Sequence, residues 1–271
     1  MKAWINNTVM SLKLTLRDRQ ALFWIYVFPV FFLFLFATVF GGGSEKAIGG
    51  LMSGLLTISA MSVGFFGLSI GLVVARERGI LRRYQLTPLK PWMIVSGEVA
   101  ANFAVLLSTL LLQLLLAKIF YGLTIEGSIV SLIVTLGLGA CAFLALGFVI
   151  ASVAENVKTA QISANMLFFP LMFLGGAAFP VQLLPPLMKK LSWLFPTRYL
   201  VEGLHRVIVE GARLEAIVTN LTVLALTTVV AAFIAAKLFR WDARERLPVA
   251  KKAWVAAVLL VFVVAALWHA Q

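Results

Sequence analysis

The sequence predicts an all-α integral membrane protein, and three observations support this fold class. Hydrophobic residues make up 62% of the 271 residues and charged residues only 13%, whereas globular domains are nearer half apolar and a quarter charged. The mean hydropathy is +1.00. The apolar residues form continuous runs of about 20, the length of a membrane-spanning helix, and not the alternating strands of a barrel. This composition excludes both a water-soluble enzyme and a disordered chain.

Six runs are long enough to cross a bilayer, and a seventh is shorter. The six are residues 21–40, 51–75, 92–116, 128–153, 159–176 and 216–238. The seventh, residues 253–270, has Trp254 and Trp268 at its ends, where the aromatic residues of membrane interfaces are found. We therefore predict a core of six spans, followed by an additional C-terminal span within residues 246–271.

The basic residues predict the orientation of these spans. With the N-terminus inside, 16 of the 23 Lys and Arg residues fall in cytoplasmic segments and 7 in outer segments, in agreement with the positive-inside rule. The formal net charge of +12 is therefore interpreted as cationic flanking of spans and not as a nucleic-acid footprint. We expect a multi-pass protein of a prokaryotic cell (inner or plasma) membrane, with a cytoplasmic N-terminus and no nucleic-acid partner.

The first segment, residues 1–19, is predicted to be an amphipathic helix in the inner membrane interface. Ile5, Val9, Leu12 and Leu16 recur at helical spacing and share one face. An alternative is that its positive charge only fixes the topology. The residues opposite the apolar face are Asn7, Ser11, Thr15 and Asp18. The basic residues assigned to this helix are Lys13, Arg17 and Arg19.

The loop between the second and third spans, residues 75–91, is longer than a turn needs. Charged residues cluster at its start, Ile80, Leu81 and Tyr84 follow at helical spacing, and prolines then end the helix. A short cytoplasmic helix with charged and apolar side chains is suited to docking on another protein. The alternative is a solvated basic loop that obeys the charge rule. The candidate contact residues are Glu77, Arg78, Gly79, Ile80, Leu81, Arg82, Arg83 and Tyr84.

The outer segment between the fifth and sixth spans, residues 177–215, is the longest loop, and four prolines interrupt it. Leu184, Leu187, Leu191 and Leu194 recur at helical spacing. The pattern predicts a broken hairpin of short apolar helices that dip into the outer leaflet or lie on it. Non-helical backbone at such depth must be covered by protein or line a cavity. An ordinary amphipathic loop is the alternative.

Two polar features lie within the predicted spans. Glu98 is the only acidic residue in a span, and we expect it to reach the nearby interface or to pair with an arginine, with proton coupling as an alternative. Asn165 lies with Gln161 and Ser163 in the most polar stretch of a span. Here hydrogen bonds between helices are favoured over a substrate site.

The second span carries small residues in pairs four positions apart, which permit close helix packing. A subunit interface is the alternative use of such pairs. They are Gly50 and Gly54, Ala60 and Gly64, and Gly67 and Gly71.

The motifs of known chemistry are absent from the sequence. It contains no phosphate-loop motif, no paired catalytic carboxylates and no Ser/His/Asp set. One cysteine, Cys141, permits no internal disulfide, and two histidines do not make a zinc site. We therefore expect no enzymatic activity, cofactor or metal in this chain.

Residues 1–245 resemble a permease subunit of the type-2 ATP-binding-cassette (ABC) exporters, and three parts in order carry the resemblance. The first is Arg17-Asp18-Arg19 before a span with Phe28-Pro29. The second is Glu77–Arg83 followed by Thr87-Pro88. The third comprises Phe179-Pro180, Leu184-Pro185, Phe195–Tyr199 and Glu202–Arg206.

The resemblance implies a half-transporter that pairs with a second permease, as a homodimer or heterodimer, and with two cytoplasmic ATPase subunits that bind the ATP and Mg. It implies that Glu77–Arg83 sit in a groove of the ATPase, with the helix of residues 1–19 beside them. It also implies a re-entrant outer hairpin near the exit of a path between the two permeases. The matching hairpin residues are Phe179, Pro180, Pro185, Pro196, Arg198 and Glu202.

The leading hypothesis is therefore the membrane subunit of an ATP-driven exporter of a drug, antibiotic, lipid or other amphiphile. A secondary transporter driven by protons or sodium is the first alternative. A membrane scaffold that recruits a cytoplasmic partner without transport is the second. The segment 246–271 departs from the six-span pattern of the family.

Overall fold

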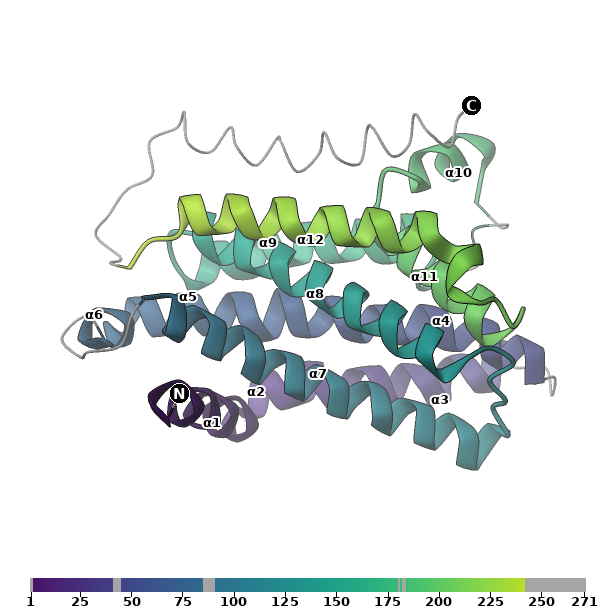
Figure 1. Cartoon of the computed structure of the whole chain (residues 1–271), viewed down its shortest axis with the longest axis horizontal. Coiled ribbons are helices and arrows are strands. Elements are labelled where there is room, and N and C mark those ends of the chain that lie inside the picture. The colour runs from purple at the N-terminus through teal and green to yellow at the C-terminus, as the bar shows by residue number, and fades with distance from the viewer. Residues whose placement is uncertain (1, 41–44, 85–90, 180, 182–183, 242–271) are drawn as a thin grey trace.

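The structure is a computed structural model that describes residues 2–40, 45–84, 91–179, 181 and 184–241. Every regular element within these residues is a helix. Figure 1 shows the long helices side by side along one axis. The predicted all-α fold class is confirmed, while the seventh predicted span, residues 253–270, lies outside the described residues.

The long helices follow the six predicted spans. The first contains α2 (Arg19–Leu22), the π-helical turn η1 (Phe23–Val27) and α3 (Phe28–Phe40). The second contains α4 (Glu45–Ser62), the π-helical turn η2 (Val63–Leu68) and α5 (Ser69–Glu77). The others are α7 (Pro91–Tyr121), α8 (Ile129–Val153), α9 (Val157–Leu174) and α12 (Val218–Leu238).

Five helices in the described part of the chain are long and apolar enough to cross a membrane. They are Ile48–Glu77, Trp92–Tyr121, Ile129–Val153, Val157–Leu174 and Leu214–Leu238. A further helix, Ile25–Val39, is apolar but shorter. It belongs to the predicted first span.

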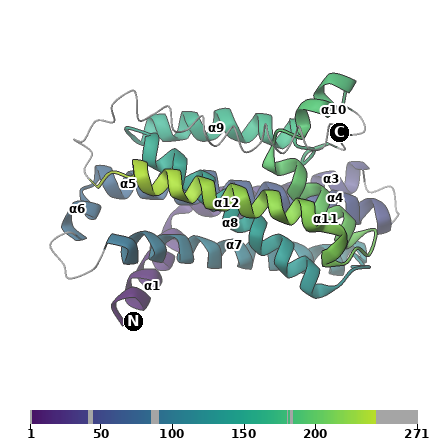
Figure 2. The ribbon, with the colours of Figure 1, turned by 45° about the horizontal axis from the view of Figure 1, so that its top comes forward.

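The short elements gather at the two ends of the bundle. At one end lie α1 (Lys2–Arg17) and α6 (Ile80–Tyr84), and at the other lie α10 (Pro186–Ser192), α11 (Pro196–Ile208) and the 3-10 turn η4 (Leu214–Ile217). We name these the α6 end and the α11 end. Figures 1 and 2 both show α1 running across the direction of the long helices.

The second helix, α4–η2–α5, is the centre of the bundle, because 78% of its most apolar window is buried. Glycine lets its neighbours approach closely. A Cβ on Gly147 of α8 would lie 1.9 Å from the Gly64 carbonyl oxygen, and one on Gly54 would lie 2.1 Å from that of Ala177. The predicted packing role is thus confirmed for Gly54 and Gly64, whereas nothing lies within 4 Å of such a Cβ on Gly71.

Candidate functional site

The turn between α5 and α6 is a glycine-terminated helix end. Gly79 has a φ of +68°, a left-handed conformation that glycine adopts without strain at helix C-termini. The Gly79 N–H donates to the Arg76 carbonyl at 3.1 Å, and the Arg83 N–H donates to the Gly79 carbonyl at 3.1 Å. The chain therefore reverses sharply and starts α6, the short helix that the sequence predicts in this loop.

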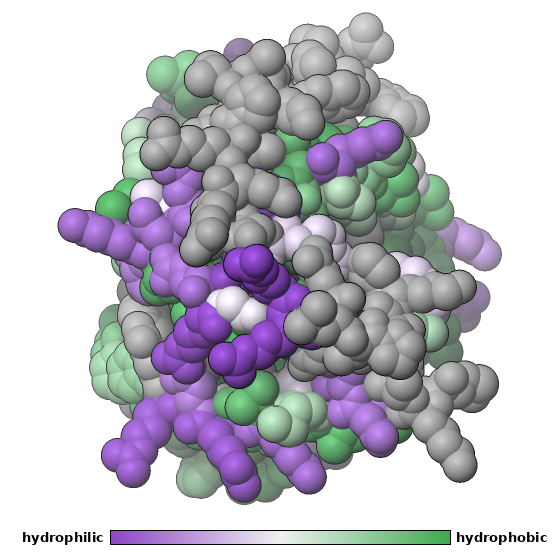
Figure 3. Space-filling model, turned by 90° about the vertical axis from the view of Figure 1, so that its left-hand side faces the viewer, coloured by the Kyte–Doolittle hydropathy of each residue, from purple (hydrophilic) through white to green (hydrophobic). Residues whose placement is uncertain are grey.

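The side chains of the α6 turn divide into an inward and an outward set. Leu81 is 1% exposed, so this predicted contact residue packs inward and helps to hold α6 on the bundle. Arg78, Arg82 and Arg83 are exposed. Figure 3 shows this end of the molecule face-on, with hydrophilic side chains gathered on it. The side chain of Tyr84 and all of residues 85–90 lie outside what the structure describes.

Two arginines cap the C-terminus of α8. Arg76 at the end of α5 is 2% exposed. Its Nη1 donates to the Ala151 carbonyl at 2.9 Å, and its Nη2 donates to the Ala154 carbonyl. Arg240, which follows α12, donates from Nη2 to the same Ala154 oxygen at 2.8 Å and to the Val153 oxygen at 3.4 Å. The last carbonyls of a helix have no partner within it, and guanidinium groups here supply one.

Glu77, the next residue, contacts the N-terminus of α9. Its Oε1 accepts from the Val157 N–H at 2.9 Å. Asn156 and Thr159 complete this helix start with a reciprocal capping box. Adjacent residues of α5 thus place a cation at the negative end of α8 and an anion at the positive end of α9. Glu77 is predicted to contact an ATPase, but its carboxylate oxygen Oε1 is directed to α9.

The N-terminal helix packs on the start of α7 through its polar face. Trp4 Nε1 donates to Ser96 Oγ at 2.9 Å, and Ser11 Oγ donates to Glu98 Oε1 at 2.7 Å. Gly97 permits this approach, since a Cβ there would lie 2.4 Å from Asn7 Nδ2. Among the described residues the partner of the Glu98 carboxylate is Ser11 of α1 and not an arginine.

The other side of α1 is open. Ile5, Val9 and Leu16 are 46%, 42% and 43% exposed, as a membrane-facing helix surface requires. Lys13, Arg17 and Arg19 are exposed as well. Asn7 and Ser11 on the opposite face are buried against α7, so the predicted amphipathic helix is present and packs on the protein through polar residues.

The α11 end is built by the chain between α9 and α12. Pro185 precedes α10, and Pro196 occupies the first turn of α11, where proline is tolerated because its missing N–H has no helical partner. Phe179 stacks on Phe173 with ring centroids 5.8 Å apart. Leu187 of α10 is 70% exposed. The broken hairpin is present, its membrane depth stays a prediction, and Pro180 lies outside the described residues.

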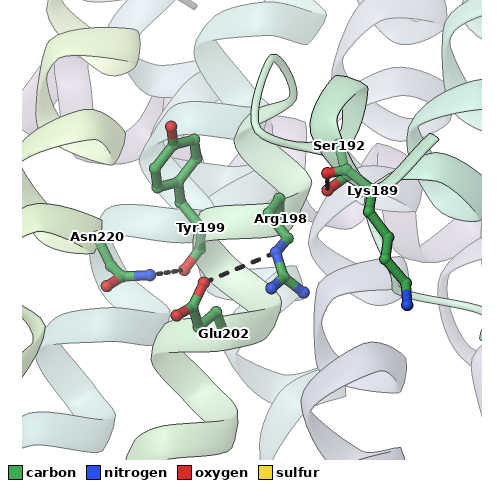
Figure 4. Close-up of polar contacts among 6 residues, drawn as sticks. All are labelled: Lys189, Ser192, Arg198, Tyr199, Glu202 and Asn220. Atoms are coloured by element: carbon green, nitrogen blue, oxygen red, sulfur yellow. Dashed lines mark hydrogen bonds and ion pairs between the residues drawn. The ribbon is translucent and has the colours of Figure 1, made fainter. Parts of the chain in front are cut away.

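The helix α11 packs deeply, and Figure 4 shows its polar contacts. Tyr199 is fully buried, and its carbonyl accepts from Asn220 Nδ2 at 3.0 Å. Arg198 Nε lies 3.7 Å from Glu202 Oε2 and its guanidinium 4.8 Å from the Trp193 ring. Burial lowers the pKa of Arg198, which Glu202 partly counteracts, and burial raises the pKa of Tyr199 to about 12. The hairpin residues Arg198 and Glu202 therefore form one ion pair within α11.

The polar stretch of α9 differs from expectation. The side chains of Gln161, Ser163 and Asn165 are partly exposed, and no hydrogen bond links them to another helix in the described part of the chain. The predicted helix–helix hydrogen bonds are therefore not found among the described residues. Only 28% of the most apolar α9 window is buried, the smallest share among the five spanning helices. The open face of this helix is apolar, with Ile162 and Met166 exposed, and the three polar residues lie at its two edges.

Three residues make side-chain contacts at the α6 end that the sequence does not indicate. They are Arg76, Arg240 and Ser11. Arg76 appears there only as one charge of a basic cluster, and Arg240 only as a flanking charge after the sixth span. The small and polar residues Ser96 and Gly97 at the start of α7 are the one signal for the α1 contact. The structure brings Arg76, Glu77 and Arg240 together around the α8–α9 turn.

Comparison with known proteins agrees with this architecture. The family described as ABC-2 type transporter matches residues 3–209. "Probable multidrug ABC transporter permease YbhR" of Escherichia coli (strain K12) is 23% identical over 190 residues, which cover 70% of this chain and 50% of the relative. YvfS of Bacillus subtilis (strain 168), named as a transport permease, is 24% identical over 213 residues, 76% of this chain and 85% of the relative.

A eukaryotic relative is also similar. "ABC transporter G family member 20" of Dictyostelium discoideum is 24% identical over 179 residues, 66% of this chain and 24% of the relative. The chain spans about half the length of the Escherichia coli permeases that it matches. Since the family match covers more than half of the residues, the chain belongs to the ABC-2 type transporter family, as a multi-pass membrane permease.

Proposed function

We propose that this chain forms half of the substrate path of an ATP-driven exporter and receives movement from a separate cytoplasmic ATPase through α6. One observation carries the proposal. The α5–α6 turn is fixed to the bundle by Arg76, Glu77 and Leu81, while Arg78, Arg82 and Arg83 are exposed. A short helix that is held rigidly and presents cations outward is suited to transmit a push from a partner protein.

The chemistry of α6 indicates the partner surface. Three exposed arginines favour an acidic groove on the ATPase. The α1 helix lies at the same end of the bundle (Figure 1) and exposes Met10 and Leu14, each by 52%, so we place it beside the same partner. ATP and Mg bind in the ATPase under this proposal, and two ATPase copies serve two permeases.

The open face of α9 supports a path between two permease copies, which form either a homodimer or a heterodimer. Gln161 and Asn165 lie at one edge of this face and Ser163 at the other, each partly exposed and without a hydrogen bond to another helix among the described residues. Polar side chains inside a membrane are costly against lipid and usually face a bundle interior or an aqueous path. Relatives named for multidrug transport favour a drug, antibiotic, lipid or other amphiphile as substrate.

Co-purification tests the proposal. The chain is solubilised gently from its native membrane, its companions are identified by mass spectrometry, and the eluate is assayed for ATP hydrolysis. We expect a stoichiometric phosphate-loop ATPase with the wild type, and its loss with Arg82→Glu combined with Arg83→Glu. Lys158→Glu, an exposed cation at the start of α9, is the control and retains the ATPase. A chain that arrives alone and drives proton- or sodium-dependent uptake in vesicles would contradict the proposal.

A further inference from the structure

The Ala154 carbonyl oxygen at the C-terminus of α8 accepts hydrogen bonds from two guanidinium groups. One belongs to Arg76, at the end of α5, and the other to Arg240, beyond the end of α12. The two side chains are 2% and 4% exposed. Three segments that are far apart in the sequence therefore meet at one oxygen atom at the α6 end.

This arrangement is electrostatically costly. Burying charge is unfavourable, and two cations on one acceptor repel each other. The negative end of the α8 dipole and the nearby Glu77 carboxylate offset part of that cost. A helix that ends at a wet surface does not need such a cap, because water satisfies its last carbonyls. The arrangement is therefore better explained by the geometry that it fixes.

Further contacts extend the link along α8. Ser152 is fully buried, and its Oγ contacts the Ala235 carbonyl of α12 at 3.1 Å. Glu77 contacts the Val157 N–H of α9 at 2.9 Å. The α5–α6 turn, the α8–α9 turn and the end of α12 are thus connected by directional contacts at several points.

We propose that Arg76 and Arg240 are positioning residues that make the α8–α9 turn and the end of α12 follow any displacement of α6. Arg76 links α6 to α8, and Arg240 links α8 to α12. This inference rests on the proposed function, because the displacing force comes from the ATPase. The contacts of Arg76 and Arg240 carry the movement into the membrane helices, and the contact of Glu77 carries it to α9.

Amide hydrogen exchange on the intact permease–ATPase complex in lipid nanodiscs tests the inference without knowledge of the substrate. Exchange is measured without nucleotide and in the vanadate-trapped ATP state. In the wild type we expect nucleotide to change exchange together in α6, in residues 151–157 and in residues 235–240. Arg240→Gln should reduce the change in residues 235–240 only, where the contact of Ser152 with Ala235 remains, and Arg76→Gln should reduce it in both distal segments.

The matched controls are Lys158→Gln and Lys237→Gln, which remove exposed cations of the same two regions and should respond as the wild type does. Arg240→Lys covers the case in which the glutamine variant does not fold. It keeps the charge but presents one nitrogen to Ala154 and Val153, so we expect a reduced response in residues 235–240. A response of wild-type size there in every folded Arg240 variant would overturn the inference. A wild type that binds ATPase but shows no nucleotide response in α6 would instead overturn the proposed function.

Discussion

The two ends of the bundle are held together by different chemistry. At the α6 end, charged side chains contact helix termini: Arg76 and Arg240 cap α8, and Glu77 contacts α9. At the α11 end, the apolar face of α11 is buried, with Tyr199 and Leu204 fully inaccessible. Apolar packing keeps helices from separating but does not fix their relative orientation. Hydrogen bonds to helix ends do both. Under the proposed function, the α6 end transmits displacement, while the α11 end stays packed.

The largest expected effect is on the apolar α11 end. Leu204→Ala removes a fully buried side chain and should lower the free energy of unfolding by about 2–5 kcal/mol. Thermal stability in detergent, followed by size-exclusion chromatography, measures the loss. Leu187→Ala in the neighbouring α10 is the control, because Leu187 is 70% exposed. Equal losses from the two variants would show that α11 does not pack as described.

A smaller loss is expected where α1 meets α7. Ser11→Ala removes the hydroxyl that donates to Glu98 at 2.7 Å and should cost about 1–3 kcal/mol, because it leaves a half-buried carboxylate with one partner fewer. Limited proteolysis of residues 1–19 in membranes should become faster. Thr15→Ala on the same helix has no comparable contact to α7 in the described residues and serves as the control. Unchanged proteolysis in Ser11→Ala would contradict the assigned contact.

Glu77→Lys separates stability from coupling. Because Glu77 is exposed and screened by water, reversing its charge at the α9 N-terminus should cost only about 1 kcal/mol. The ATPase should still bind, but ATP-driven export by the complex should be lost. Glu210→Lys, an exposed acid at the α11 end, should leave export intact. Full export by Glu77→Lys would show that Glu77 is not a coupling contact.

The smallest effect is expected for the ion pair of the α11 end. Glu202→Gln weakens a contact to Arg198 that is 3.7 Å long and partly exposed, so the loss of stability should be about 0–1 kcal/mol. The same Glu→Gln exchange at position 77 should impair export, whereas at position 202 it should not. Comparable export in the two variants would show that the two ends do not differ in their role in coupling.

The sequence predicts the spans and the short elements well, since local patterns determine them. Continuous apolar runs mark the long helices, and Gly79 before Ile80 marks the start of α6. The caps of α8 could not be predicted, because Arg76 and Arg240 meet Ala154 only where α5, α8 and α12 pack together. The contact between the polar side of α1 and α7 could not be predicted either. A polar helix face can meet water or the polar groups of another helix, and spacing alone does not distinguish the two.

The central claim, that α6 is the contact to the ATPase, is tested most directly by site-specific photocrosslinking in native membranes. A photoreactive amino acid replaces Arg83 at the α6 end and, in a separate variant, Lys189 at the α11 end; both side chains are exposed. We predict a crosslink to the phosphate-loop ATPase from position 83 and none from position 189. A co-purifying ATPase that crosslinks from position 189, or from neither position, would contradict the account.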